Sequence, residues 1–368
     1  MARLGDYVSI KTGKLDANAA NENGLYPFFT CSVKPLTINT YHYDCECVLV
    51  AGNGDLNVKY YNGKFDAYQR TYIIESNDKE VLSVPYLYCF LDKYVETLRK
   101  QSIGGVIKYI KLGNLTEAQI PLCNIEEQCE IVKILEKVNG LIADRKEQLS
   151  KLDEVVKSRF IEMFGDPVAN PFNWKTVLLK NATSKIGSGA TPKGGKESYQ
   201  SEGITLIRSM NVHDGRFEYK DLAHITDEQA KQLDNVVIEE NDVFINITGA
   251  SVARSCIVPK HILPARVNQH VAIIRCISSM LNPVFANNMF LNISFKGQLL
   301  DIGESGGATR QAITKQQLEM LNVILPPIDL QNEFATFVEQ TDKLKFEVKQ
   351  ALEKLEFLKK SLMQKYFV

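Results

Sequence analysis

Apolar residues recur at helical spacing along two long stretches, one near the middle of the chain and one at its end. In residues 124–164 the apolar positions follow a near-heptad repeat, and residues 328–367 carry a similar stripe. This pattern is typical of long amphipathic helices. Because one such helix cannot bury its stripe alone, we expect the two helices to pack against each other in antiparallel orientation.

Both stretches carry helix boundary signals. Asn124 and Glu127 have the spacing of a capping box, in which two side chains satisfy free backbone N–H groups of the first turn. Gly165 and Pro167 indicate where the first helix ends, because proline disfavours helical geometry in the residue before it. Pro326-Pro327 directly precedes the second helix.

The remaining residues have a different pattern. Short apolar runs at 47–50, 71–74, 243–247 and 271–274 predict strands, and the Asn-Gly pairs at 53–54 and 62–63 indicate turns. Residues 1–123 and 168–325 are each long enough to form a core of their own. We interpret them as two mixed α/β bodies.

The second half of the chain repeats the first. Residues 101–165 align with 304–368 without a gap, with identical pairs from Gly104 over Gly307 to Phe164 over Phe367. The bodies align more weakly, through Ile10 over Ile186, Gly13 over Gly189, Gly52 over Gly249, and Tyr68-Gln69-Arg70 over Asn268-Gln269-His270. Self-similarity of this kind usually sets the whole architecture. We therefore predict an α+β fold with a pseudo-twofold repeat, in which two globular bodies are separated by two long antiparallel coiled-coil helices. The predicted domain boundaries are 1–123, 124–166, 167–325 and 326–368.

Composition narrows the class of protein. Of 368 residues, 45% are hydrophobic and 24% are charged, as in an ordinary globular protein. No apolar stretch approaches the roughly 18–20 residues that span a bilayer, and the first residues lack the apolar core of a signal peptide. The eight cysteines are scattered, several of them in apolar runs, which favours reduced and buried thiols. We expect a cytoplasmic protein with no membrane contact.

The net charge is only −1, so binding to a polyanion would depend on how the charges are distributed. Residues 243–300 contain no Asp or Glu but carry Arg254, Lys260, Arg266, Arg275 and Lys296. Residues 97–116 and 179–196 are also basic and free of acids. These runs indicate a basic face on each body. The alternative is that the charges are spread around each domain.

Signals for catalysis and for metal binding are weak. The glycine-rich segment 187–196 lacks both the first glycine of a Walker A loop and the Ser or Thr that follows its lysine. Asn170-Pro171-Phe172 is similar to the motif with which amino-methyltransferases hold a target base. However, it lacks one proline and no glycine-rich cofactor motif precedes it, so a linker turn is favoured. Neither the cysteines nor the five histidines have metal-ligand spacing. We therefore expect a non-catalytic binding protein without a metal or cofactor of its own.

The residue types in the matched loops suit contacts with DNA. Basic, glycine-rich loops with Ser and Thr suit phosphate contacts, for which the candidates are Lys185, Ser188, Thr191, Lys193 and Arg254. Amide and guanidinium groups read base edges, for which the candidates are Gln69, Arg70, Arg266, Asn268 and Gln269. Further DNA-binding candidates are Lys11, Lys14, Asn53, Lys59, Lys108 and Arg310. Gln69 and Gln269 could instead fix the start of a strand in both halves, and each of the other residues could fill a surface or turn role.

The chain resembles the specificity subunits of type I restriction–modification systems. The similarity rests on two segments before the long helices, Ile120-Pro121-Leu122 with Ile125-Glu126-Glu127-Gln128, and Val323-Ile324-Leu325-Pro326-Pro327-Ile328-Asp329-Leu330-Gln331. Met163-Phe164-Gly165-Asp166-Pro167, Ser188-Gly189-Ala190-Thr191-Pro192 and Tyr68-Gln69-Arg70-Thr71-Tyr72 are also typical of the family. The likeness covers essentially the whole chain in the family's order. The first body departs from it, with Lys11-Thr12-Gly13-Lys14 where the family has Ser-Gly-x-Thr-Pro.

The resemblance implies that target recognition domains at 1–123 and 167–325 each read one half of a split, asymmetric sequence in double-stranded DNA. The central conserved helix (124–166) and the C-terminal conserved helix (326–368) would fix the gap between the halves and dock two methyltransferase (modification) subunits. Restriction/translocase subunits would join them, and S-adenosylmethionine, ATP and magnesium would belong to these partners. Two rival interpretations remain. One is a stand-alone sequence-specific DNA-binding regulator or scaffold, and the other is a self-contained DNA methyltransferase or nuclease.

Overall fold

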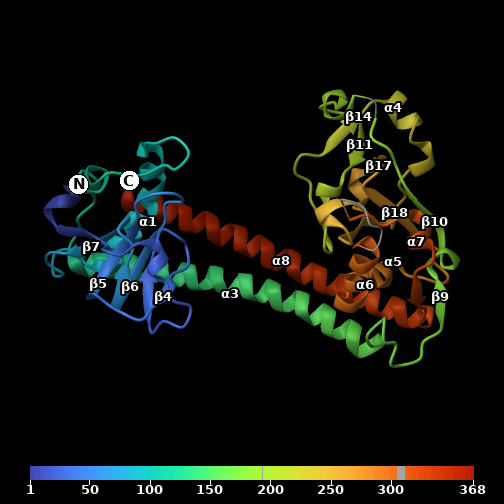
Figure 1. The fold of residues 1–368 in the computed structure, drawn as a ribbon, viewed down its shortest axis with the longest axis horizontal. Helices are drawn as coiled ribbons and strands as arrows, with labels where there is room; N and C mark the ends of the chain where they lie inside the picture. Colours follow the sequence, from blue (N-terminus) through green and yellow to red (C-terminus); the bar gives the residue numbers. More distant parts are fainter. Residues whose placement is uncertain (193, 305–310) are drawn as a thin grey trace. The chain divides into compact units, whose positions relative to one another are not determined.

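The computed structural model describes residues 1–192, 194–304 and 311–368, apart from the side chain of Lys196. The chain divides into two compact units, Met1–Glu147 with Lys349–Val368 (unit 1) and Gln148–Val348 (unit 2) (Figure 1). The long helices α3 (Ile125–Phe164) and α8 (Ile328–Phe367) each contribute one part to each unit. None of the helices in the described ranges is long and apolar enough to cross a membrane.

Unit 1 is built on a six-stranded sheet. The strand order is β2 (Val8–Thr12), β7 (Thr71–Ser76), β5 (Tyr43–Ala51), β6 (Val58–Ala67), β3 (Tyr26–Phe29) and β4 (Leu36–Ile38), and only the β3–β6 pair is parallel. Helix α1 (Val84–Gln101) packs against β5 and β6. A short helix, α2 (Leu112–Thr116), precedes β8 (Gln119–Ile120), which pairs with β1 (Ala2–Arg3). Short 3-10 turns lie at Leu4–Asp6 and Ala17–Ala19.

Strand β5 supplies two separate cores because side chains alternate across a strand. Val48 and Val50 belong to the main core, which also contains α1. Cys47 and Leu49 belong to a smaller cluster with Phe65 on the other side. Residues 47–51 of the strand are therefore buried on both faces, and this part of the sequence is a continuous apolar run instead of an alternating one.

The main core of unit 1 includes both ends of the helix pair. Leu135 comes from the first turns of α3, whereas Met363 and Phe367 come from the last turns of α8. The ring centroid of Phe367 lies 5.2 Å from that of Tyr86 in α1. The end of the chain thus completes the hydrophobic core of the first domain.

Unit 2 has the same plan with additional strands. Its four-stranded sheet has the order β10 (Thr183–Ser188), β18 (Val271–Cys276), β15 (Val243–Asn246) and β16 (Ser255–Ile257). A three-stranded sheet, β14 (Ala223–Ile225), β11 (Ile204–Ile207) and β17 (Ala265–Val267), adjoins it. The two-stranded pairs are β12 (Val212–His213) with β13 (Arg216–Phe217), and β9 (Thr176–Leu178) with β19 (Asn322–Ile324). The helices are α4 (Asp227–Lys231), α5 (Pro283–Leu291), α6 (Ile293–Glu304) and α7 (Lys315–Glu319), with 3-10 turns at Leu179–Asn181, Gly195–Ser198, Ser209–Asn211, Asp234–Val236, Gly249–Ser251 and Lys260–Ile262.

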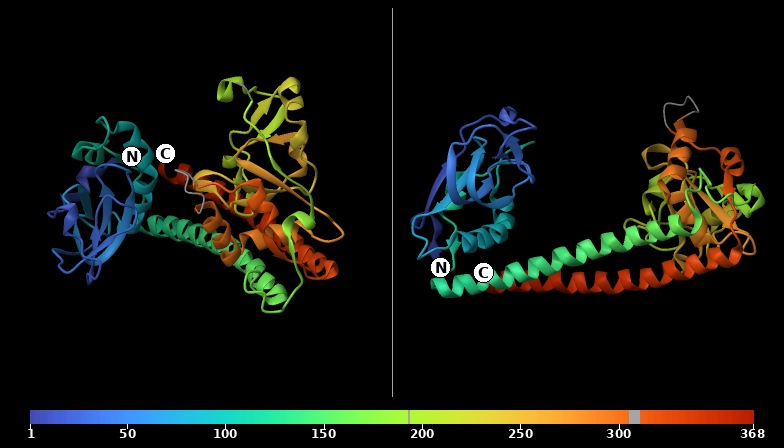
Figure 2. Two further views of the ribbon diagram at one scale, coloured as in Figure 1. Left: turned by 45° about the vertical axis from the view of Figure 1, so that its right-hand side comes forward. Right: turned by 90° about the horizontal axis from the view of Figure 1, so that it is seen from below.

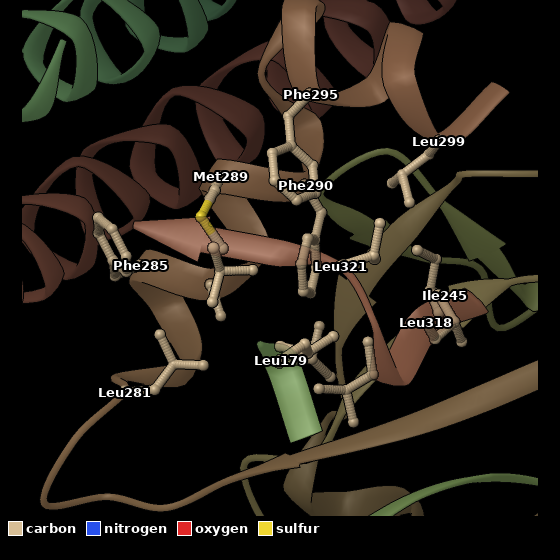
Figure 3. Packing of buried hydrophobic residues seen from close by; sticks show 14 of the residues in the cluster. Leu179, Ile245, Leu281, Phe285, Met289, Phe290, Phe295, Leu299, Leu318 and Leu321 are labelled. Carbon is tan, nitrogen blue, oxygen red and sulfur yellow. The ribbon is translucent and has the colours of Figure 1, made fainter. Parts of the chain in front are cut away.

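The core of unit 2 is rich in aromatic side chains. Figure 3 shows how α5 and α6 direct Phe285, Phe290 and Phe295 into a cluster that also holds leucines from the flanking segments. Phe164, at the end of α3, lies against Phe285 with 4.7 Å between ring centroids, in edge-to-face geometry. It occupies the position in unit 2 that its repeat partner Phe367 occupies in unit 1.

The two long helices are antiparallel. In unit 1 the start of α3 lies beside the end of α8, and Lys146 pairs with Glu356 at 3.2 Å. In unit 2 the end of α3 lies beside the start of α8, and Arg159 pairs with Glu333 at 3.3 Å (Figure 2). Exposed ion pairs of this kind contribute about 0–1 kcal/mol each, so buried apolar residues such as Phe160 contribute most of the stability.

A buried glutamine fastens the start of each long helix to the domain before it. The Gln128 side chain is 0% exposed; its Oε1 accepts from Ser83 N at 3.0 Å, and its Nε2 donates to Val81 O at 2.8 Å and Cys123 O at 2.9 Å. Gln331, its repeat partner, makes the same three bonds, with Asn282 N (2.9 Å), Met280 O (3.0 Å) and Pro326 O (2.8 Å). All polar atoms of both buried amides are therefore used.

These features confirm the predicted fold class, with two mixed α/β bodies, a long antiparallel helix pair and an internal repeat. The order β2-β7-β5-β6 in unit 1 corresponds to β10-β18-β15-β16 in unit 2. The four domain boundaries stay predictions, because the division into compact units cuts both long helices instead of following their ends.

Candidate nucleic-acid interface

Unit 1 gathers three separate segments around a turn at residues 68–70, here called the first turn. The turn joins β6 to β7. Gln69 N donates to Leu15 O at 2.9 Å, and Gly52 N donates to Arg70 O at 2.8 Å. The Cys31 thiol also lies 3.6 Å from Arg70 O. These bonds bring the ends of β2, β3 and β5 to one side of the sheet.

Unit 2 builds the same arrangement around residues 268–270, here called the second turn. Gly189 N donates to Asn268 O at 3.1 Å, and Ile247 N donates to His270 O at 3.0 Å. The Thr191 hydroxyl donates to the side-chain oxygen of Gln269. The segments after β10 and β15 therefore contact the second turn. The segments after β2 and β5 contact the first turn in the same way.

A glycine is required where the chain passes each turn. An added Cβ on Gly13 would lie 2.2 Å from Ala67 O, and one on Gly189 would lie 1.8 Å from Val267 O. Real side chains do not approach a carbonyl oxygen so closely. The aligned glycines thus serve close backbone approach, which explains why both halves keep them.

The hydrogen bonds correct one part of the sequence alignment. Gly54 N donates to Lys108 O at 2.9 Å, and Gly249 N donates to Gln311 O at 2.9 Å. Both glycines have positive φ, +70° and +75°. Gly249 is therefore the counterpart of Gly54, and the alignment of Gly52 with Gly249 was wrong by two residues. The error arose because this short glycine-containing loop has no apolar periodicity to fix its register.

Five of the predicted residues of unit 1 lie around the first turn. Lys14, Gln69, Arg70 and Lys108 are exposed, and Asn53 is half-buried. Asn53 is also bridged to Tyr109, next to Lys108. We call Lys14, Asn53, Gln69, Arg70 and Lys108 the first cluster. It combines cations with amide groups, the two side-chain types that contact phosphates and base edges.

The other two predicted residues of unit 1 have partners within the protein. Lys11 pairs with Glu75 at 3.0 Å, and this hydrogen bond, with the carboxylate charge, raises the pKa of Lys11. Lys59 donates to Asn57, and burial lowers the pKa of its amino group. Both lie on strands and neither belongs to the first cluster.

The corresponding residues of unit 2 include Ser188, Thr191 and Gln269. Thr191 and Gln269 are exposed, and Ser188 is half-buried at the end of β10. His270 lies beside them, with its Nδ1 2.5 Å from the Thr248 hydroxyl. We call Ser188, Thr191, Thr248, Gln269 and His270 the second cluster. The sequence analysis missed Thr248 and His270 as candidates, although the alignment of His270 with Arg70 was a usable signal.

Two predicted base readers of unit 2 are buried. The Arg266 guanidinium binds Asp234 Oδ1 at 2.9 Å, Ala230 O at 3.3 Å and Ala265 O at 3.1 Å. Asn268 is also buried, and its side-chain oxygen accepts from His270 N at 3.0 Å. Both side chains hold local structure in place, so we leave them out of the proposed DNA contacts.

The remaining candidates of unit 2 either make no hydrogen bond to residues 268–270 within the described part of the chain or lie outside the described residues. Lys185 is half-buried within β10. Arg254 is half-buried, and its Nη1 lies 3.5 Å from His213 Nδ1. Lys193 and Arg310 lie outside the residues that the structure describes.

The acid-free stretch 243–300 does not form an unpaired basic face. Four of its five cations pair with carboxylates from other segments: Arg266 with Asp234, Lys260 with Glu240, Arg275 with Asp242, and Lys296 with Asp214. Arg254 alone of the five has no carboxylate partner among the described residues. The fold brings acids from residues 214–242 onto these cations, which sequence runs could not reveal. No group of three or more His, Cys, Asp or Glu in the described parts of the chain is placed to hold a metal ion.

Comparison with known proteins points to one family. The model of the type I restriction modification DNA specificity domain matches residues 1–152 and 171–356. The specificity subunit of the Escherichia coli restriction enzyme EcoDI is 37% identical over 154 residues, which cover 42% of this chain and 34% of that protein. The EcoAI specificity subunit of the same species is 26% identical over 223 residues, covering 57% and 36%. The aligned regions thus span only about a third of these two relatives. The MjaVIII specificity subunit of Methanocaldococcus jannaschii is 20% identical over 394 residues, covering 99% of this chain and 90% of that protein.

Solved structures share the fold. A crystal structure of the S subunit of a type I restriction–modification system from M. genitalium covers all of this chain, and this chain covers 95% of it, with a TM-score of 0.62 and 16% identity. A chain from a study of complex assembly and conformational transition in the type I restriction–modification system gives a TM-score of 0.60 at 17% identity, covering 99% and 96%. With the family model matching both halves, this chain belongs to the family of type I restriction–modification DNA specificity subunits.

Proposed function

We propose that this chain is the DNA specificity subunit of a type I restriction–modification complex, and that its two domains each read one half of a bipartite, asymmetric DNA site. The observation that carries the proposal is the duplicated turn arrangement. The backbone bonds around residues 68–70 and 268–270 are alike, whereas the side chains around them differ. Two turns with similar backbones but different side chains are suited to read two different half-sites.

The exposed side chains have the chemistry for this task. Arg70 has no carboxylate partner among the described residues, and a guanidinium can bind the O6 and N7 atoms of guanine. Lys14 and Lys108 lie beside it and suit phosphate contacts, which set position without reading sequence. In unit 2 the cluster is less basic, with hydroxyl and amide groups from Thr191 and Gln269. Each such side chain contributes by hydrogen bonding, and the chain itself performs no catalysis in this proposal.

The helix pair would set the gap between the half-sites. Each helix has 40 residues, a length of about 60 Å at about 1.5 Å per residue. One turn of DNA spans about 34 Å, so helices of this length are long enough to separate two domains by more than one turn. The gap would then depend on the number of residues in α3 and α8.

Matched apolar positions on the helices suit the docking of two identical partners. Leu141 and its repeat partner Leu344 are both exposed, at 37% and 52%. Val155 and its repeat partner Leu358 are also exposed, at 47% and 44%. Each unit therefore carries one member of each pair. A surface that occurs twice under pseudo-twofold symmetry suits two copies of one methyltransferase subunit. The methyltransferase and the restriction/translocase subunits would supply S-adenosylmethionine, magnesium and ATP.

The alternative is a stand-alone sequence-specific DNA-binding regulator or scaffold without methylase partners. The two turn clusters would serve such a protein equally well. The repeated apolar positions on the helices favour the specificity subunit, because a regulator that acts alone has no need of two matched docking surfaces.

The test is to co-express the chain with its modification subunit and map methylated adenines across the genome. The proposal expects a two-part, asymmetric motif with a fixed gap, which disappears when this chain is omitted. The Arg70→Ala variant should alter only one half of the motif, and Lys79→Ala, which removes an exposed cation paired with Glu46, should alter neither. A soluble complex without chain-dependent methylation would contradict the proposal. Tight specific DNA binding by the purified chain alone, again without methylation, would favour the regulator.

A further inference from the structure

Residues 103–109 of unit 1 form a closed hairpin that carries apolar side chains into solvent. Ile103 and Tyr109 exchange both backbone hydrogen bonds, at 3.0 and 2.9 Å. At the tip Val106 is fully exposed, and Ile107 is 63% exposed. The turn requires glycine at position 104, because its φ is +116° and an added Cβ would lie 2.6 Å from Ile107 O. The domain gains no buried area from these exposed aliphatic side chains. They are therefore suited to contact another molecule.

The base of this hairpin is continuous with the first cluster. Lys108 O accepts from Gly54 N, and Ile110 N donates to Gly52 O, both at 2.9 Å. Gly52 N in turn donates to Arg70 O at 2.8 Å. One segment, residues 52–54, therefore connects the hairpin to the turn that carries Gln69 and Arg70, and a ligand on that turn would lie beside the hairpin.

The charges around the hairpin favour a polyanion over a protein surface. Residues 97–116 contain no Asp or Glu. Lys100, Lys108 and Lys111 in this stretch are all exposed. Asp55 follows Gly54, which bonds to the hairpin base, and its carboxylate pairs with Arg99 at 3.3 Å. Aliphatic side chains at a tip flanked by exposed cations match the wedges with which proteins enter the base stack between phosphate contacts.

We propose that this hairpin inserts Val106 and Ile107 against the base pairs of the half-site that unit 1 reads, unstacking one base step. The proposal rests on the proposed function above. It also predicts an asymmetry between the halves. The residues aligned with 103–107 in the second half are Gly306, Gly307, Ala308, Thr309 and Arg310, which include no large aliphatic side chain. The wedge therefore acts at one half-site only.

The test uses the full chain in complex with its modification subunits, and a duplex that carries the site mapped by methylation. 2-Aminopurine, which fluoresces more strongly when unstacked, replaces each purine of the site in turn. The expected result is a rise at one step within or beside the unit 1 half-site and none in the other half. Replacing both Val106 and Ile107 by Ser should abolish the rise and weaken binding about tenfold, or by about 1.4 kcal/mol. Val106→Leu should keep the rise, and Leu25→Ser, which changes an 81% exposed aliphatic side chain elsewhere in unit 1, should change neither reading.

The outcomes distinguish a failure of the wedge from a failure of the specificity function. Site-specific binding by the unaltered complex without any fluorescence rise overturns the wedge and leaves the specificity function standing. No site-specific binding by the unaltered complex contradicts the specificity function itself. A Ser variant whose complex keeps both the affinity and the fluorescence rise would overturn the proposal, and one that no longer co-purifies with the modification subunit would make the hairpin a protein contact and overturn it too. If that double variant does not fold, Val106→Ala, which shortens one fully exposed side chain, is judged by the same criteria.

Discussion

Replacing Gln128 by Met removes a buried amide while keeping the length of the side chain. The change deprives Ser83 N of its acceptor and the carbonyl oxygens of Val81 and Cys123 of their donor. Ser83 is the N-cap residue of α1, so the change loosens the junction between α1 and the start of α3. The methionine itself leaves no buried polar atom of its own without a partner.

The size of the effect follows from the groups left without partners. A buried donor or acceptor without a partner costs about 1–3 kcal/mol, so three such groups, partly relieved by local movement, should cost about 3 kcal/mol. For units of this size, a loss of about 1 kcal/mol lowers Tm by about 2–4 °C. We therefore expect unit 1 to unfold roughly 6–12 °C earlier in Gln128→Met.

Differential scanning calorimetry, with hydrogen exchange to assign each transition to a unit, measures this shift. Gln340→Met is the matched control, because Gln340 is an exposed glutamine on the other long helix. It should leave Tm unchanged. If Gln128→Met also unfolds within about 1 °C of the unaltered protein, the three bonds are not holding the junction together, and the inference from burial is refuted.

Four further predictions follow from the same structure. Arg70→Ala should weaken binding to a duplex carrying the mapped site by about 1–3 kcal/mol and relax one half-site; equal loss on unrelated DNA would instead indicate phosphate contact. Gly189→Ala should disturb the second half-site only, because its Cβ would meet Val267 O, and an unchanged methylation motif would contradict this. Matched insertions of about seven residues after Lys146 in α3 and Val348 in α8 should add two helical turns and lengthen the gap; a folded, active variant with unchanged spacing would refute the spacer role. Phe367→Ala should destabilise unit 1 by about 3–5 kcal/mol and leave unit 2 unchanged, as judged by hydrogen exchange; protection lost in unit 2 would contradict the core assignment.

Long periodic elements could be predicted from the sequence because their signal is local and repeated. The predicted helix at 328–367 coincides with α8 (Ile328–Phe367), and the run at 71–74 lies within β7 (Thr71–Ser76). The repeat also holds in the strand register, where Ile10 faces Ile74 and Ile186 faces Ile274. Each of these elements owes its place to apolar spacing that many residues support at once.

The candidate site was harder to predict, because each of its residues depends on contacts distant in sequence. Arg266 had the chemistry of a base reader, but Asp234 and two carbonyl groups occupy its guanidinium inside the domain. A composition count cannot foresee which acids the fold brings beside a basic run, as Asp242 beside Arg275 demonstrates. That Gly54 and Gly249 are equivalent positions of the repeat became clear only from their hydrogen bonds to Lys108 and Gln311.

Each domain core contains the start of one long helix and the end of the other. Each domain is fastened to the start of its own helix by Gln128 or Gln331, and its core is completed by the end of the other helix, through Phe367 or Phe164. The helix contacts thus involve repeat-equivalent residues in both units, whereas the loops around the turns at 68–70 and 268–270 make none of these contacts. Substitutions in the turn clusters can therefore alter recognition without disturbing the junctions. Substitutions at the buried glutamines and phenylalanines disturb the core of a domain whichever DNA sequence it reads.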